Sequence, residues 1–446
     1  MPQATDPLRP AQTVNVRAGI FFDGTGNNLA NSLAKNLEGA RVGSYAAAPS
    51  NVALLYRLYA GDASGVLDPG GTLCFRFYIE GVGTAEGEDD MLRGLLTGRG
   101  QSGVEARVGQ AMQQFGRQLR AWLGEHPQVE LGRIEFDLFG FSRGAAAARH
   151  LANDLRKGPD SLLGRDLERQ GRLEWKRRLS INFIGLFDTV AAIVAPLAGN
   201  FSPANDQYEG LALELDETLA YRVVQLVAQD EGRHNFPLVA TRWDIPLPGA
   251  HSDIGGGYQV REQEQQYLCK PRSNLVSAST PVERTRAYAE VLGLLDGLEC
   301  KEGQVVTWEE PLPASAHKHE GPEKRAYAAL YREREVLGHL SRIYLRIMQQ
   351  LAVDSGAPLA VLEEADPLHE LPDELRDISR KLHDYAFGLT DHTGLTSEEQ
   401  GLLRARYIHS SAHWNPFKGL RNSELDALYI DRPAAAGRLV HGLTAR

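Results

Sequence analysis

The five residues GFSRG centred on Ser142 constrain the fold more than any other part of this sequence. They match the pattern G-x-S-x-G. An apolar run over residues 134–139 predicts a strand before them, and the small residues 145–152 predict a helix after them. The turn between strand and helix must be sharp, and side chains at Gly140 and Gly144 would collide with neighbouring backbone. We therefore predict a nucleophile elbow with Ser142 as a catalytic nucleophile; an ordinary serine in a glycine-rich turn is the alternative.

The surrounding sequence alternates between predicted strands and predicted helices. This alternation is typical of a parallel sheet covered on both faces. The predicted fold class is therefore α/β, an α/β-hydrolase-like and mostly parallel sheet with helices on both faces, plus a mainly helical C-terminal region. Besides the strand before Ser142, strands are predicted over 14–22, 73–79, 181–187 and 238–243, and further helices over 51–59 and 104–123.

The chain divides into regions of different character. Residues 1–12 are expected to be a disordered N-terminus, and residues 13–260 the catalytic core. The polar residues 261–325 read as an insertion or linker, and 326–446 as a helical cap or lid. Leucines and other apolar residues fall on one helical face over 327–351. Packing of that face against the core is favoured over a lid or a membrane-touching surface.

Composition excludes several classes of protein. The chain of 446 residues has a net charge of -10, which argues against nucleic acid as a partner. Its beginning is polar and lacks the apolar core of a signal peptide, so we expect synthesis in the cytoplasm. The three cysteines form no CxxC pair, and no cofactor or metal is predicted.

A serine nucleophile needs a base, and the base needs a carboxylate to orient it. In hydrolases with this kind of elbow the chain order is serine, acid, histidine. Asp188 ends a strongly apolar strand and is the predicted acid, with a helix N-cap as its alternative role. His251 lies in the glycine-rich turn 249–258 and is the predicted base. His409 is the alternative base.

The negative oxygen of an acyl-transfer intermediate needs N–H donors. The backbone N–H of Arg143 is the first predicted donor, because it directly follows the nucleophile. The second is expected from the loop 23–28 after the first strand, where Gly24 permits close approach of substrate. Asp23 is included in this predicted oxyanion hole, holding the loop by hydrogen bonds or binding a metal ion. The loop lacks the lysine and spacing of a P-loop.

Taken together, the motifs resemble a known family, the first family of type VI secretion lipase effectors. The stretches that carry the resemblance are FFDGTGNN, GFSRGAAAAR, GLFDTV and PGAHSDIGGGY, in this order, and more loosely YIHSSAHWN. The resemblance implies an α/β-hydrolase domain with phospholipase or related esterase activity through Ser142, Asp188 and His251. It also implies delivery by the type VI machinery into the target-cell periplasm, transient contact with a membrane surface, and a spike protein and an immunity protein as partners.

The leading functional hypothesis is a carboxyl-ester hydrolase, a phospholipase of A1 or A2 type that passes through an acyl-serine intermediate. An esterase or amidase acting on a non-lipid substrate would use the same three residues. A non-catalytic interaction module on a hydrolase scaffold is the third hypothesis, and the intact set of serine, acid and histidine argues against it.

Overall fold

The computed structural model describes residues 12–33, 47–81, 103–168, 179–191, 210–296, 303–312, 322–415 and 431–442. The N-terminus predicted to be disordered lies outside these residues, except for Gln12, which begins the first strand. None of the helices in the described ranges is long and apolar enough to cross a membrane.

A seven-stranded sheet forms the centre of the fold, in the order β2-β3-β1-β4-β5-β6-β8. All neighbouring strands are parallel except the edge strand β2, which runs antiparallel to β3. The predicted α/β class with a mostly parallel sheet is therefore confirmed. The strands are β1 (Gln12–Phe22), β2 (Val66–Leu67), β3 (Thr72–Ile79), β4 (Val129–Phe141), β5 (Leu179–Phe187), β6 (Arg222–Ala228) and β8 (Asp244–Leu247).

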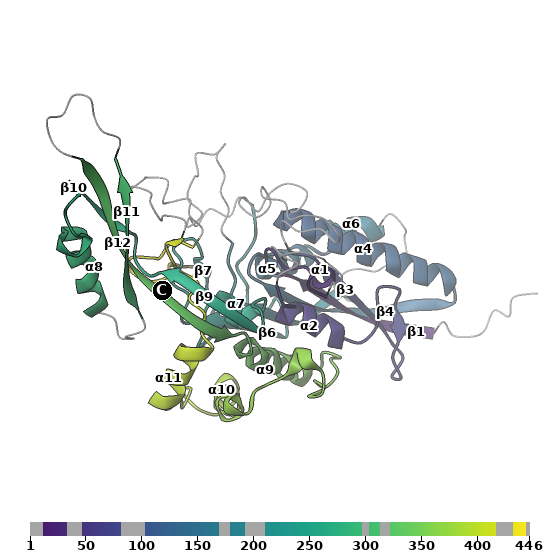
Figure 1. Ribbon diagram of the computed structural model, residues 1–446. Coiled ribbons are helices and arrows are strands. Elements are labelled where there is room, and N and C mark those ends of the chain that lie inside the picture. The colour runs from purple at the N-terminus through teal and green to yellow at the C-terminus, as the bar shows by residue number, and fades with distance from the viewer. Residues whose placement is uncertain are drawn as a thin grey trace, which may run out of the picture.

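Helices cover both faces of this sheet, as Figure 1 shows. Ile20 and Phe22 of β1 pack into one apolar cluster with α4, α5 and α6, whereas Phe21 packs into another with α2 and α9. Alternate residues of a strand point to opposite faces, so each strand contributes to two cores. The helices around the sheet are α1 (Leu29–Leu33), α2 (Asn51–Leu58), α4 (Val104–Glu125), α5 (Arg143–Leu155), α6 (Leu162–Glu168), α7 (His251–Gly255) and α9 (Leu340–Asp354).

The fifth strand differs from its prediction. Residues 222–228 form β6, whereas only Leu238–Val239 of the predicted strand 238–243 are extended, as β7. Gln225 interrupts the apolar run of β6, so the sequence pattern did not predict this strand. Its side chain is buried and donates to the carbonyl of Val239 at 3.1 Å and to Asp244 at 2.7 Å. A buried polar side chain is tolerated when it is hydrogen-bonded in this way.

The polar residues 261–325, predicted to be an insertion or linker, contain regular secondary structure. They contribute to a second, antiparallel sheet of four strands that projects from the core (Figure 1). Its side chains are polar because much of the sheet faces solvent. The elements of this lobe are β9 (Arg261–Tyr267), β10 (Arg272–Ser277), α8 (Arg286–Asp296), β11 (Gln304–Pro311) and β12 (Glu323–Leu337).

The helix predicted over 327–351 is divided into two elements. Its first half is strand, because β12 continues to Leu337, and α9 begins at Leu340. Ile343, Tyr344 and Ile347 of α9 are fully buried against the core, so this helix is packed rather than exposed. The rest of the predicted helical region contains α10 (Arg376–Ala386), α11 (Ser397–Arg406) and a short strand β13 (Val440–His441) that pairs with β7.

A buried carboxylate ties the middle of the sheet together. Asp137 of β4 accepts hydrogen bonds from Arg17 at 2.8 Å, from Asn182 at 2.8 Å and from the hydroxyl of Tyr59 at 2.6 Å. Arg17 and Asn182 lie on the two strands that flank β4, while Tyr59 follows α2. A buried charge is stable only when it is paired and hydrogen-bonded.

We predict that Tyr59→Phe lowers the free energy of unfolding by about 2 kcal/mol, because it removes a hydrogen bond to a buried charge. Tyr221→Phe is the matched control, since Tyr221 is 81% exposed. Urea denaturation of both variants measures the difference. Equal stability of Tyr59→Phe and wild type would contradict the importance of this contact.

Candidate active site

Ser142 lies on a sharp turn between β4 and α5, as predicted. Its backbone has φ 57° and ψ -123°, an unusual conformation for a residue with a side chain. A Cβ atom at Gly140 would lie 2.4 Å from the carbonyl oxygen of Gly144, and one at Gly144 would lie 2.2 Å from that of Phe22. Both neighbours are backbone atoms that cannot move aside. The structure therefore supports the steric reason given for the two glycines.

Asp188 directly follows β5, the strand beside β4. It is fully buried and has a positive φ of 44°. Its backbone N–H donates to the carbonyl of Leu226 at 2.8 Å, and its carboxylate accepts from the N–H of Ala228 at 3.0 Å. The predicted acid is thus fixed to the neighbouring strand β6. It caps no helix in the described part of the chain.

His251 is the first residue of α7, and its side chain reaches Asp188. Nδ1 of His251 lies 2.5 Å from a carboxylate oxygen of Asp188, and both side chains are almost completely buried. With Nδ1 facing the carboxylate, Nε2 is the ring nitrogen left to exchange protons. The structure brings together the predicted acid and the predicted base.

Ser142 is held next to this pair by its own backbone. Its N–H donates to the carbonyl of Phe187 at 3.0 Å, and its carbonyl accepts from Val190 at 3.4 Å, so the contacts flank Asp188. The ring of the preceding Phe141 packs on that of His251, with centroids 4.7 Å apart. The Ser142 hydroxyl makes no hydrogen bond to another described residue. Contacts between nucleophile and base are commonly loose until substrate binds.

Arg438 is part of the site, although no sequence pattern indicated it. Its two terminal nitrogens each donate to one oxygen of Asp188 at 2.7 Å. Burial would raise the pKa of Asp188, but the charge of Arg438 and the hydrogen bond with His251 outweigh it and hold the pKa well below its usual range. Asp188 therefore stays ionised despite being buried. No local pattern marks an arginine 250 positions from its partner.

Glu231 and Arg233 form a second ion pair, which contacts the backbone of His251. The Glu231 carboxylate accepts from the backbone N–H of His251 at 3.2 Å and from the Arg233 side chain at 2.9 Å. Burial opposes ionisation of Glu231, but Arg233 lowers its pKa to about 2. Sequence reasoning missed both residues, which lie in an ordinary polar loop after β6.

The environment of His251 favours the neutral form of its imidazole. Burial has the largest effect and lowers the pKa of His251; Asp188 and Glu231 oppose it, and Arg233 adds to it. The net shift is downward from the ordinary value of 6.5. A neutral imidazole can accept a proton, so His251 keeps the form of a general base below the pH at which a free histidine would lose it.

The loop after β1 lies against the elbow, but two of its predicted oxyanion donors are engaged. The N–H of Asp23 donates to the carbonyl of Ile79 at 2.9 Å, and that of Gly24 donates to the Asp23 carboxylate at 2.7 Å. These two amides cannot face an oxyanion in this conformation, which corrects that part of the prediction.

Thr25 accepts a 2.5 Å hydrogen bond from the Arg143 side chain and brings the tip of the loop to the start of α5.

Asp23 holds this loop in place. The Tyr78 hydroxyl donates to its carboxylate at 2.5 Å, and burial raises the pKa of Asp23 to about 6. Within the described ranges, no three His, Cys, Asp or Glu side chains are grouped so that they could hold a metal ion.

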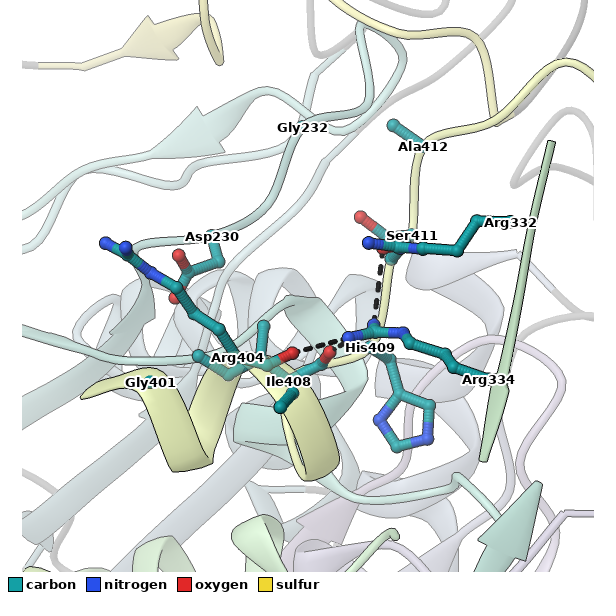
Figure 2. Close-up of a pocket in the computed structure, with 12 residues that line it drawn as sticks. Asp230, Gly232, Arg332, Arg334, Gly401, Arg404, Ile408, His409, Ser411 and Ala412 are labelled. Carbon is teal, nitrogen blue, oxygen red and sulfur yellow. Dashed lines mark hydrogen bonds between the residues drawn. The ribbon is translucent and has the colours of Figure 1, made fainter. Parts of the chain in front are cut away.

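His409, the alternative base, is placed elsewhere. Its Nδ1 lies 2.7 Å from Asp253, and its ring stacks on that of Tyr258 with centroids 3.7 Å apart. It lies in the wall of a cavity of about 420 Å³, next to Arg334 and Ser411 in Figure 2. The structure therefore brings His251, and not His409, to Asp188.

The same cavity is connected to the candidate site. Figure 2 shows Ser411 in its wall, and the Ser411 hydroxyl donates to Glu231 at 2.9 Å. Because Glu231 also accepts from the backbone of His251, the cavity wall and the start of α7 share one carboxylate.

Two comparisons with known proteins found a match. Residues 156–278 match the family described as "T6SS, Phospholipase effector Tle1-like, catalytic domain". A solved structure described as the Tle1 effector bound to the VgrG spike of the type 6 secretion system matches with a TM-score of 0.76. It is 26% identical in sequence, and the match covers 98% of this chain and 95% of that one. Both matches support the Tle1-like family of type VI secretion lipase effectors. The predicted family is thereby confirmed, and with it a hydrolase domain.

The segment of this Tle1-like chain that matches the family contains Asp188 and His251 and begins after Ser142. A crystal structure of an uncharacterized protein from Pseudomonas aeruginosa is 20% identical, with a TM-score of 0.42 over 85% of this chain and 51% of that one. That likeness is too low to support an argument. No curated protein matches the sequence.

We predict that Gly144→Ala destabilises the protein by about 3 kcal/mol, because the added methyl group meets two backbone carbonyls. Gly109→Ala, in α4, is the matched control: no described atom lies within 4 Å of its Cβ, and alanine favours a helix by about 1 kcal/mol. Thermal and urea unfolding measure the stability of both variants. A Gly144→Ala protein as stable as wild type would show that the turn is less tight than described.

Proposed function

We propose that this Tle1-like effector is a serine-dependent phospholipase of A1 or A2 type. The observation that carries the proposal is the buried pairing of His251 with Asp188 at 2.5 Å beside the strained Ser142 turn. This combination of nucleophile, base and orienting acid is the one that acyl transfer requires. The family description, which names a phospholipase effector, supports lipid as the substrate.

In the proposed reaction the Ser142 hydroxyl attacks the carbonyl carbon of an acyl ester while Nε2 of His251 takes its proton. Asp188 holds the imidazole in the required tautomer through Nδ1. When the intermediate collapses, His251 returns the proton to the leaving lysophospholipid oxygen. Water then hydrolyses acyl-Ser142 by the same route and releases a fatty acid.

The oxyanion would be bound at the start of α5. Arg143 is the first residue of that helix, where backbone N–H groups lack helical partners and the helix dipole favours negative charge. For the second donor we propose the backbone N–H of Thr25 in place of Asp23 and Gly24. The hydrogen bond between the Thr25 and Arg143 side chains supports this choice.

Delivery and partners are proposed from the comparisons. The solved relative is described as an effector bound to a VgrG spike, and we propose that this chain is likewise carried by a spike protein into the periplasm of a target cell. There it would act on the membrane surface. An immunity protein in the producing cell is proposed from the family resemblance.

The test is hydrolysis of phospholipid vesicles by purified wild type and Ser142→Ala. We expect Ser142→Ala to lose at least about 1,000-fold in kcat, because nothing else supplies the nucleophile. Ser64→Ala, an exposed serine, should retain full activity. Release of fatty acid by Ser142→Ala at the wild-type rate would refute the proposal.

The same assay separates the alternatives. Wild-type activity on soluble short-chain esters or amides, with none on vesicles, would favour the non-lipid hydrolase. A folded wild type that cleaves neither would favour the interaction module. Comparing His251→Gln with His409→Gln identifies the base: we expect only the former to lose its activity, with circular dichroism showing that both variants are folded.

A further inference from the structure

The C-terminal residues 431–442 lie along the loop that leads to His251. The N–H of Ala434 donates to the carbonyl of Gly232 at 2.8 Å, and that of Leu238 donates to the carbonyl of Leu439 at 2.9 Å. Beyond these contacts, β13 pairs with β7 (Figure 1, yellow beside β7). Arg438 is therefore fixed between two anchored stretches of backbone.

The Arg438 side chain is held as firmly as its backbone. It is 9% exposed, and its Nε donates to the carbonyl of Phe236 at 2.8 Å. The two terminal nitrogens meet the two oxygens of Asp188 in parallel, both at 2.7 Å. This fork geometry fixes the plane of a carboxylate as well as its charge, which a single ammonium group cannot do.

We propose that Arg438 is a positioning residue for the hydrolase, acting on His251 through Asp188. The inference rests on the proposed function of the Ser142 site. Arg438 orients the Asp188 carboxylate so that one oxygen points at Nδ1 of His251, and it cancels part of the negative charge that His251 meets. Ala228 at the end of β6 also donates its backbone N–H to this carboxylate, but it brings no positive charge.

The charges around His251 show how this cancellation works. Asp188 and Glu231 attract a proton to the imidazole, whereas Arg233 repels it. Arg438 offsets the charge of Asp188. Arg233 offsets Glu231 and is also 3.4 Å from Asp431. Arg438 is the cation bound to Asp188. Without Arg438, the Asp188–His251 pair would carry an uncompensated negative charge and would take up a proton at a higher pH.

The test is the pH profile of kcat/KM for Arg438→Met. We expect its acid limb to move upward by about one pH unit. On the acidic side kcat/KM would fall about tenfold, and under alkaline conditions kcat/KM would fall less. Arg76→Met is the matched control, because Arg76 binds the carbonyls of residues 56, 57 and 59, none of which belongs to the site. That variant should keep the wild-type profile. A folded Arg438→Met protein with the wild-type profile overturns the inference.

Arg438→Lys decides the matter if Arg438→Met does not fold. Lysine keeps the positive charge but loses the fork, so we expect a wild-type acid limb with kcat reduced about tenfold. A wild-type kcat in folded Arg438→Lys would overturn the positioning role.

A nuclear magnetic resonance titration of labelled histidine separates this inference from the proposed function. It is carried out on Ser142→Ala with and without Arg438→Lys or Arg438→Met, and it needs no turnover. We expect the Met variant to raise the apparent pKa of the Asp188–His251 pair and the Lys variant to leave it nearly unchanged. An unchanged pKa in the Met variant refutes the role of Arg438 even in a protein whose Ser142 is catalytic.

Discussion

The Asp188 carboxylate has no exposure to solvent, and the candidate site is arranged around the need to keep it ionised. A buried charge without partners costs several kcal/mol. Here the end of β5 receives a guanidinium from the C-terminal segment, an imidazole from α7 and a backbone N–H from the end of β6. These partners come from regions far apart in sequence. The requirements of one carboxylate therefore explain why the chain returns to the edge of the sheet after the helical region.

Two strained backbone positions stand side by side at this edge. Ser142 and Asp188 both have positive φ values, and they follow the neighbouring strands β4 and β5. Each conformation costs about 1–3 kcal/mol, which packing elsewhere must offset. The two large apolar clusters on the faces of the sheet provide that packing. With this support, the backbone of Ser142 is held next to the residues that flank Asp188.

The elements that the sequence predicted well are those with local signals. The elbow follows from two glycines and a serine, and β1, β3, β4 and β5 follow from apolar runs bounded by turns. Asp188 and His251 follow from chain order and position at strand ends. The strand β6 was missed because Gln225 is buried by hydrogen bonds that no local pattern reveals. The second sheet was missed because its strands are polar.

The contacts that could not be predicted depend on tertiary structure. Arg438 meets Asp188 only because β13 pairs with β7, and neither strand exceeds two residues. The Gly24 amide is engaged by the side chain of its own neighbour, which removes it as an oxyanion donor. Both cases concern the direction of a single hydrogen-bonding group, which the order of residues does not specify.

Labelling with a fluorophosphonate tests the central claim, that Ser142 is an activated nucleophile, most directly. Such a probe forms a covalent bond only with a serine whose hydroxyl is activated by a base. Peptide mass spectrometry of the labelled protein should locate the adduct on Ser142, and phospholipid hydrolysis should fall in proportion to labelling. An adduct on another serine, or phospholipid hydrolysis that continues in fully labelled protein, would contradict the account.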